Sequence, residues 1–411
     1  MAESSKGVIL VDVGTPRDLS KKAVQDYLNE FLGDPFVIRG PQWIREILFK
    51  RIIIPLRASK SLEKYQRIWS PEGSPLRIEI EKVSELLQVK LQSHRQSHRQ
   101  SHLQPYLQPY LQLKVDEPSI VNESDNIIKP TDRFVESNND WLVRFAFHYG
   151  GPSIESVMQS LTEVGVKELI IVPLYPQWAL STRGSLEDRF NKMKSVGGNG
   201  NESYAGFSKV SMTPVFYDNE GFLEAQSQLL KSNLPEVIDD EVAIVFSFHG
   251  LPQSHIRAVT PNCKTCLKRE GECRPNPKSI SFCYRYQCFE TARQISSKAG
   301  LLNWDVAFQS RLGPMRWLEP SLLEVTDNLL EQGVKTMIVQ CPSFVADCLE
   351  TIDEVGQELM EYFLRKGGKQ FILVPALNHS EVWLNTLEKM ITKQIGVNYE
   401  VSSSPSSTTS L

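Results

Sequence analysis

The 411-residue sequence lacks the features that define several large classes of protein. It contains no run of about eighteen or more apolar residues, the length that a transmembrane helix requires. Basic residues are not in excess, since the formal net charge is −4, and this argues against nucleic acid as a partner. The N-terminus has no basic start, long apolar core or small-residue cleavage site of a signal peptide. We therefore expect a cytoplasmic protein, with peripheral contact to the inner face of the cell membrane as an alternative.

What is present is an ordinary globular composition, with 41% hydrophobic and 23% charged residues. Short apolar runs rich in β-branched residues alternate with segments of helical periodicity. This alternation predicts parallel sheets that are covered by helices on both faces. The predicted strands are residues 7–13, 142–147, 168–173, 209–213, 243–248, 306–309, 336–340 and 371–374. The predicted helices include residues 20–33, 76–91 and 153–164.

An internal resemblance between the two halves indicates a duplication. In the first half, Gly151-Pro152 precedes a helix, and Gly165-Val166-Lys167 precedes an apolar strand. In the second half, Gly313-Pro314 and Gly333-Val334-Lys335 occupy the corresponding places. The sequence therefore predicts two similar doubly wound, Rossmann-like α/β units with an active-site cleft between them. We assign residues 1–220 to the first unit and residues 221–395 to the second.

Two segments do not follow this plan. Residues 92–134 contain the tandem repeats SHRQSHRQSH and LQPYLQPYLQ, and are predicted to be a low-complexity insertion. The repeat spaces His94, His98 and His102 so that a helix would align them for a metal, but repeat expansion in a surface loop explains the pattern better. Residues 396–411 have the composition of a disordered tail.

Ligands of open α/β sheets bind beyond the carboxyl ends of the strands, and this rule selects His249. It directly follows an apolar strand, and an imidazole can hold a divalent metal or accept a proton. A second segment, residues 341–354, starts at the end of the matching strand and enters a helix. One face of that helix carries the carboxylates Asp347, Glu350, Glu354 and Glu358. Such a row is usually a solvated surface, but at a strand end it could pass protons or cations.

Two further segments could hold a flat apolar ligand with polar edges. Residues 175–185 combine Tyr175 and Trp178 with hydroxyl groups. A packed turn before a helix is the alternative. Residues 309–320 offer guanidinium groups for a carboxylate and the indole of Trp317 for stacking.

These segments, taken in order, resemble motifs of the ferrochelatase family over nearly the whole chain except the 92–134 insertion and the tail. The opening GVILVDVGTP is similar to the family's LLNxGTP strand, and YQRIWSPEGSPL to YxxIxGGSPL. Further matches are LYPQWALSTRGS, FSFHGLPQSH, FQSRLGPMRWLEP and SFVADCLETIDEV. The resemblance implies a lyase of heme biosynthesis that inserts Fe²⁺ into protoporphyrin IX and releases two protons.

The resemblance also implies roles for single residues. His249 and Glu350 match the pair that faces the porphyrin centre from opposite sides, and we expect His249 to accept protons and Glu350 to be the metal-side ligand. The residues that match porphyrin-binding positions are Arg67 and Ser310 for the propionates and Tyr149, Tyr175 and Trp317 for the macrocycle. Asp347 and Glu354 match an acidic path that leads from the site.

Three positions depart from the family pattern. Asp12 stands where Asn is usual, His148 where Arg often precedes Tyr149, and Cys348 where many members have His. The change at 148 alters one expected pocket contact. The change at 348 removes an outer histidine that could assist metal entry.

Five of the seven cysteines lie between residues 263 and 288. Cys263, Cys266, Cys273 and Cys283 are close enough in sequence to bind tetrahedral zinc or an iron–sulfur cluster, and spacing alone does not separate the two. The family resemblance favours a [2Fe–2S] cluster, because a bacterial subset carries one in this internal segment. Unligated loop cysteines are the alternative.

Other readings of the whole chain remain open at this point. The same motifs would suit a chelatase for coproporphyrin or for another divalent metal. A non-catalytic iron–sulfur or heme-binding sensor could also use this fold, although the presence of both His249 and Glu350 argues against it. Residues 36–56 mix large apolar side chains with Arg and Lys, and are expected either to touch a membrane or to pack on the protein itself.

Overall fold

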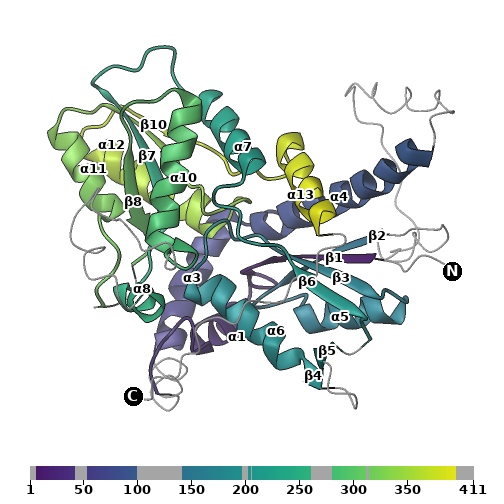
Figure 1. Ribbon diagram of the computed structural model, residues 1–411. Coiled ribbons are helices and arrows are strands. Elements are labelled where there is room, and N and C mark those ends of the chain that lie inside the picture. Colours follow the sequence, from purple (N-terminus) through teal and green to yellow (C-terminus); the bar gives the residue numbers. More distant parts are fainter. Residues whose placement is uncertain are drawn as a thin grey trace, which may run out of the picture.

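The computed structural model describes residues 6–41, 53–99, 141–196, 202–204, 206–260, 280–311, 313 and 315–394. Within these ranges, two four-stranded parallel sheets lie side by side with helices around them (Figure 1). The first sheet has the order β2 (Trp141–Phe147), β1 (Lys6–Asp12), β3 (Glu168–Pro173), β6 (Lys209–Met212). The second has the order β10 (Gln370–Leu373), β9 (Thr336–Gln340), β7 (Val242–His249), β8 (Asp305–Gln309). The predicted α/β fold with parallel sheets is confirmed.

Helices connect and cover these strands. Those of the N-terminal half are α1 (Lys21–Gly33), α3 (Ile54–Ile68), α4 (Pro75–Arg99), α5 (Ile154–Glu163), the π-helix η2 (Leu180–Gly184) and α6 (Ser185–Met193). Those of the C-terminal half are α7 (Glu220–Lys231), α8 (Gln253–Val259), α10 (Tyr284–Ala299), α11 (Leu322–Glu331), the π-helix η3 (Glu350–Leu359), α12 (Met360–Arg365) and α13 (Glu381–Lys393). A short antiparallel pair, β4 (Ser195–Val196) and β5 (Glu202–Ser203), follows α6.

The two sheets have the same topology. If the strands of each sheet are numbered along the chain, both sheets have the order 2-1-3-4. In each unit the third strand pairs with the first in parallel register, with Glu168 opposite Lys6 and Thr336 opposite Val242. The predicted duplication is therefore present in the fold.

One of the residue pairs that the sequence matched between the two halves is corrected by the structure. Gly151-Pro152 corresponds to Glu319-Pro320 rather than to Gly313-Pro314. Pro152 and Pro320 each follow a cis peptide bond and are each followed by a serine that caps a helix. The carbonyl of Pro152 accepts from the N–H of Phe147 in β2, and the carbonyl of Pro320 accepts from the N–H of Phe308 in β8. The sequence match was wrong because a second Gly-Pro pair, Gly313-Pro314, lies six residues before the equivalent Pro320.

Side chains of the first strands alternate between two cores, as expected for strands that are buried on both faces. In β1, Val8 and Leu10 join a large core that also includes Ile244 and Phe246 of β7. Because the inner faces of both sheets share this core, the two units pack together without a solvent layer. The outer faces have cores of their own, with α5 and α6 in the first unit and α11 and η3 in the second.

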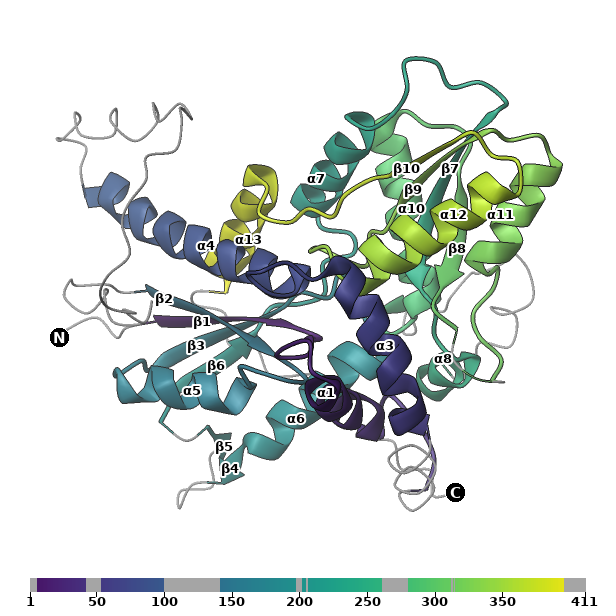
Figure 2. The ribbon, with the colours of Figure 1, turned by 180° about the vertical axis from the view of Figure 1, so that it is seen from behind.

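The C-terminal helix α13 packs against both α7 and α4, and so contacts a helix of the first unit (Figures 1 and 2). The imidazole of His379, just before α13, also lies 2.6 Å from a carboxylate oxygen of Glu79 in α4. The proposed boundary at residue 220 stays a prediction, and this packing shows that the end of the second unit returns to the first.

Candidate active site between the two sheets

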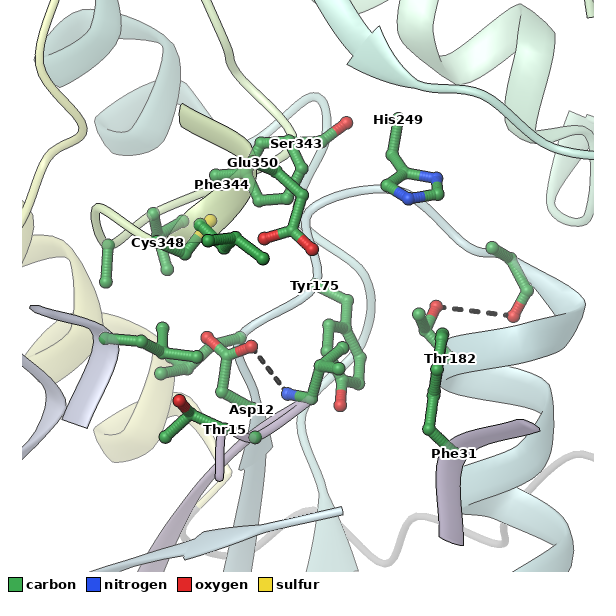
Figure 3. A pocket seen from close by; sticks show the side chains of 18 of the residues that line it. Asp12, Thr15, Phe31, Tyr175, Thr182, His249, Ser343, Phe344, Cys348 and Glu350 are labelled. Carbon is green, nitrogen blue, oxygen red and sulfur yellow. Dashed lines mark hydrogen bonds between the residues drawn. The ribbon is translucent and has the colours of Figure 1, made fainter. Parts of the chain in front are cut away.

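A pocket lies where the carboxyl ends of strands from both sheets face each other (Figure 3). The pocket and its opening to solvent together have a volume of about 1130 Å³. Asp12 ends β1, His249 ends β7, and Glu350 begins η3, so each chemical group follows a strand or begins a helix. Further lining residues are Tyr27, Phe31, Tyr65, Ile68, Leu174, Tyr175, Pro176, Leu251, Tyr284, Phe344, Val345 and Leu349.

The imidazole ring of His249 is oriented by the backbone of the next residue. Its Nδ1 lies 2.7 Å from the carbonyl oxygen of Gly250. A carbonyl can only accept, so Nδ1 carries the proton, and Nε2 of the neutral ring has a free lone pair. The hydroxyl of Tyr284 donates to the carbonyl of His249 at 2.9 Å. These bonds hold the imidazole in a form that can accept a proton or bind a metal.

Glu350 is the first residue of the π-helix η3, and its carboxylate points into the pocket (Figure 3). The side-chain amide of Gln309 donates to the backbone carbonyl of Glu350 at 3.0 Å, while its oxygen accepts from Ser247 at 2.6 Å. The buried Gln309 therefore ties the end of β8 and the middle of β7 to the start of η3. Burial, followed by the charge of Glu350, raises the pKa of the Cys348 thiol, which keeps this thiol neutral.

Asp12 is a third acidic group in the pocket, and the sequence analysis did not select it as a site residue. Its carboxylate accepts from the backbone N–H of Val13 at 2.6 Å. Burial raises the pKa of Asp12 to about 7; the Val13 bond opposes this shift, and the charge of Glu350 adds to it. The available signal was its place at the end of an apolar strand.

The walls of the pocket are mainly apolar and include six Phe and Tyr side chains, which suits a flat apolar ligand. Tyr175, one of the predicted macrocycle contacts, lines the pocket and is buried. Its hydroxyl has no hydrogen-bond partner among the described residues. Burial, together with the charges of Asp12 and Glu350 nearby, raises the pKa of Tyr27 well above its usual value.

The predicted acidic row lies along η3, but it is partly neutralised. Glu354 accepts from the hydroxyl of Ser310, and Lys64 of α3 lies 3.6 Å from Glu354 and 2.8 Å from Glu358. Burial, followed by the charge of Glu350, raises the pKa of Glu354. The row of carboxylates thus runs from Glu350 in the pocket to Lys64 on the neighbouring helix α3.

Asp347 does not continue this row. Its carboxylate accepts from Thr351 at 3.0 Å and from Asn378 at 2.8 Å, and so supports the turn into η3. Ser310, predicted to hold a propionate, does not line the pocket and donates to Glu354 instead. The role predicted for each of these residues stays a prediction.

Three other predicted porphyrin contacts also lie outside the pocket. Arg67 forms two hydrogen bonds with the fully buried Asp353, at 2.5 and 2.8 Å. Tyr149 donates to Asp34 at 2.7 Å beside a separate hollow of the first unit. Trp317 pairs with Pro252 in the loop after His249, and its ring lies where a side chain at Gly250 would be in van der Waals contact with it. Asp353 was missed by the sequence analysis, because an acidic residue on a helix is most often exposed.

The cysteine cluster is only partly described. Cys263, Cys266 and Cys273 lie outside the described residues, while Cys283 is buried directly before α10. The N-terminal end of a helix favours a thiolate, so this position fits a metal or cluster ligand. No group of three or more metal-ligating side chains occurs within the described part of the chain.

A duplicated parallel α/β fold with a pocket at the strand ends, lined by a histidine, two carboxylates and aromatic side chains, is an arrangement typical of enzymes. Comparison with known proteins identifies the kind of enzyme. The ferrochelatase family model matches residues 5–129 and 118–395. The chain therefore belongs to the ferrochelatase family, and it is a lyase of heme biosynthesis that inserts ferrous iron into porphyrin.

Relatives of known name support this membership. The chain is 32% identical over 392 residues to ferrochelatase of Coxiella burnetii, a match covering 95% of this chain and 94% of the relative. It is also 32% identical to ferrochelatase of Bdellovibrio bacteriovorus over 394 residues, covering 94% of this chain and 98% of that one. Among solved structures, SirB from Bacillus subtilis with Fe³⁺ is matched at a TM-score of 0.44 and 10% identity, covering 95% of this chain and 96% of that one.

Proposed function

We propose that iron enters the porphyrin in the pocket between the sheets, with His249 as proton acceptor and Glu350 as the metal-side ligand. The observation that carries the proposal is the placement of an imidazole with a free Nε2 and a carboxylate in one aromatic pocket. Family membership identifies the reaction, and the position of His249 and Glu350 in the pocket supports this pocket as its site.

The chemistry of the reaction matches these groups. A free-base porphyrin has two N–H protons that must leave as the metal enters. Nε2 of His249 can take a pyrrole proton because its Nδ1–H is already donated to Gly250. The Glu350 carboxylate replaces water on the incoming Fe²⁺, and Gln309 positions its backbone. The aromatic walls exclude water and hold the macrocycle by its apolar periphery.

We assign protoporphyrin IX as the porphyrin, with coproporphyrin as the alternative. None of the described residues that line the pocket is Lys or Arg. Arg67, the cation expected to hold a propionate, is engaged by Asp353. A pocket without cations favours the porphyrin with fewer carboxylates. Turnover with both porphyrins, followed by absorbance, tests the assignment, and a clear preference for coproporphyrin would reverse it.

The variant His249→Ala tests the proposed site. Because the proton acceptor is removed, turnover is expected to fall by at least about a hundredfold, whereas porphyrin affinity changes by less than about threefold. His379→Ala is the matched control, since this histidine is half-exposed and pairs with Glu79 away from the pocket. Near-normal turnover of His249→Ala would place the reaction elsewhere.

We further propose that Cys263, Cys266, Cys273 and Cys283 hold a [2Fe–2S] cluster, which would supply structural or regulatory stabilisation rather than electrons for metallation. The burial of Cys283 at the start of α10 supports one of the four ligands. Protein purified without oxygen should contain about two irons and about two sulfides per chain. A colourless protein with a single zinc would overturn the assignment.

Peripheral contact with the inner face of the cell membrane through residues 36–56 is also a proposal. Residues 42–52 lie outside the described residues, and Val37 and Ile38 are buried beside Tyr149. Leu56, at the start of α3, is 71% exposed and supports an apolar contact. No described helix has the length and apolar character needed to cross a bilayer. Absence of binding to anionic liposomes would contradict the proposal.

A further inference from the structure

Asp12 occupies the pocket but has no part in the roles proposed above. It ends β1 in the first unit, whereas His249 and Glu350 belong to the second. In Figure 3 its carboxylate rises from the floor of the pocket toward the space below Glu350. Both duplicated units therefore contribute an ionisable side chain to the pocket from the end of their first strand, Asp12 from β1 and His249 from β7.

Among the residues that the structure describes, no cation pairs with this carboxylate. Within the described part of the chain, its one hydrogen bond comes from the N–H of Val13, and it forms no ion pair. The ionisable groups that influence it or that it influences are Glu350 of η3, Tyr27 of α1 and Tyr175 after β3. The charge of Glu350 raises the pKa of Asp12, while burial, together with the charge of Asp12, raises the pKa of both tyrosines. A half-buried aspartate without a counter-charge is costly, so its presence in the pocket calls for a function.

We propose that Asp12 is a second proton acceptor of the metal-insertion reaction. The proposal rests on the assignment of this pocket as the reaction site. Insertion releases two protons, and one neutral imidazole can hold only one of them. As the pyrrole N–H bond breaks, the Asp12 carboxylate forms an O–H bond, and the nitrogen lone pair becomes available to Fe²⁺. The charge balances: the macrocycle loses two protons as it binds Fe²⁺, one proton neutralises the Asp12 carboxylate, and the other converts the neutral imidazole of His249 to an imidazolium.

Two features of the site suit Asp12 to this step. Its pKa of about 7 lies close to neutral pH, so it can take a proton and give it back within one turnover. Its position in the first unit also lets it act independently of His249, which is fixed by Gly250 in the second unit. An asparagine at the same position would keep a polar side chain but could not accept the proton.

The experiment compares Asp12→Asn and Asp12→Glu with the wild-type protein. Asp12→Asn preserves the shape of the side chain, and is expected to lower kcat at pH 8 by about tenfold or more while porphyrin Kd changes by less than about twofold. The wild-type rate should rise with pH through about 7 as Asp12 loses its proton, and this rise should be absent in Asp12→Asn. Asp12→Glu, which keeps a carboxylate, should recover part of the rate.

Asp26→Asn is the matched control, because this residue of α1 is exposed and outside the pocket. Wild-type turnover of Asp12→Asn at every pH would overturn the inference, and so would a loss explained by equally weakened porphyrin binding. Circular dichroism of each variant confirms that it is folded. The His249→Ala variant separates the two proposals: if it is inactive while Asp12→Asn is normal, the pocket assignment stands and only the role of Asp12 fails.

Discussion

At the scale of single residues, the close approach of two backbones at Gly14 fixes the floor of the pocket. Gly14 has a φ of +113°, and a Cβ there would lie 1.9 Å from the carbonyl oxygen of Tyr149. The N–H of Tyr149 donates in turn to Val13 at 2.9 Å. Only glycine can fill this position without moving the loop that carries Asp12 and Thr15 into the pocket.

The substitution Gly14→Ala is expected to reduce the free energy of unfolding by about 3 kcal/mol, from backbone strain and the clash with Tyr149. Gly33→Ala is the control, because Gly33 ends α1 with no atom near its missing Cβ. That change should be neutral or stabilising by about 0.5 kcal/mol. Chemical denaturation followed by circular dichroism measures both. Equal stability of the two variants would contradict the argument.

Some residues selected from the sequence line the pocket and others do not, for a definable reason. His249, Glu350 and Tyr175 follow apolar strands or begin helices, and the rule for strand ends selects such positions. Arg67 was expected to bind substrate because it matches a propionate-binding position of the family. Its partner Asp353 lies 286 residues away, and a pairing over that separation has no local pattern in the sequence.

At the scale of secondary structure elements, the π-helix η3 links the pocket to α3. A π-helix forms i→i+5 hydrogen bonds, so residues four and five apart share a face. Glu350, Glu354 and Glu358 are therefore aligned, whereas Asp347 precedes the helix and turns to Asn378. The expected α-helical spacing placed Asp347 in the row, because a π-helix of ten residues is rare and cannot be foreseen from periodicity.

The ion pairs between α3 and η3 are expected to hold α3 in place over the pocket. Asp353 has no exposed side-chain surface and is paired with Arg67, with Lys64 further away at 3.8 Å. Arg67→Ala would leave a buried carboxylate without its main partner, and should cost about 2 kcal/mol of stability. Arg67→Lys keeps the charge but loses the paired geometry, so its loss should be smaller.

The exposed pair Lys192–Asp188 provides the comparison, since the Lys192 side chain is 72% exposed. Lys192→Ala should change the free energy of unfolding by less than about 1 kcal/mol. Thermal unfolding of the three variants in parallel measures the differences. If Arg67→Ala instead leaves stability unchanged and raises KM for porphyrin, Arg67 holds a propionate, as the family resemblance implies.

The positions of the strands were easier to predict from the sequence than the hydrogen bonds between loops and strands. Each predicted strand agrees with an observed one to within one residue at either end, because continuous β-branched runs between glycines and prolines leave few alternatives. The pairing of the duplicated prolines was missed, since it depends on hydrogen bonds such as that from Phe308 to Pro320. Such bonds reflect the packing of a loop on a sheet, which the local sequence does not record.

At the scale of the whole molecule, the two units meet through both a shared core and a polar contact. The polar contact joins residues 34–41 of the first unit to α8 of the second. Arg39 donates to the carbonyl of Ser254 at 3.1 Å, and the buried His255 forms a backbone hydrogen bond with Val37. Burial, reinforced by the charge of Arg39, lowers the pKa of His255 to about 4. The contact therefore requires a neutral imidazole.

This requirement predicts how acid acts on the molecule. In the unfolded chain His255 titrates near 6.5, so between about pH 6.5 and 4 the unfolded state binds one more proton than the folded state at this position. The contribution of His255 to stability is thus present above pH 6.5 and is lost as the pH falls toward 4. His255→Gln, which cannot be protonated, should be less stable than wild type at pH 7.5, and the difference should shrink at pH 5. Urea unfolding at both values measures it, and a constant difference would exclude His255 as an acid-sensitive contact between the units.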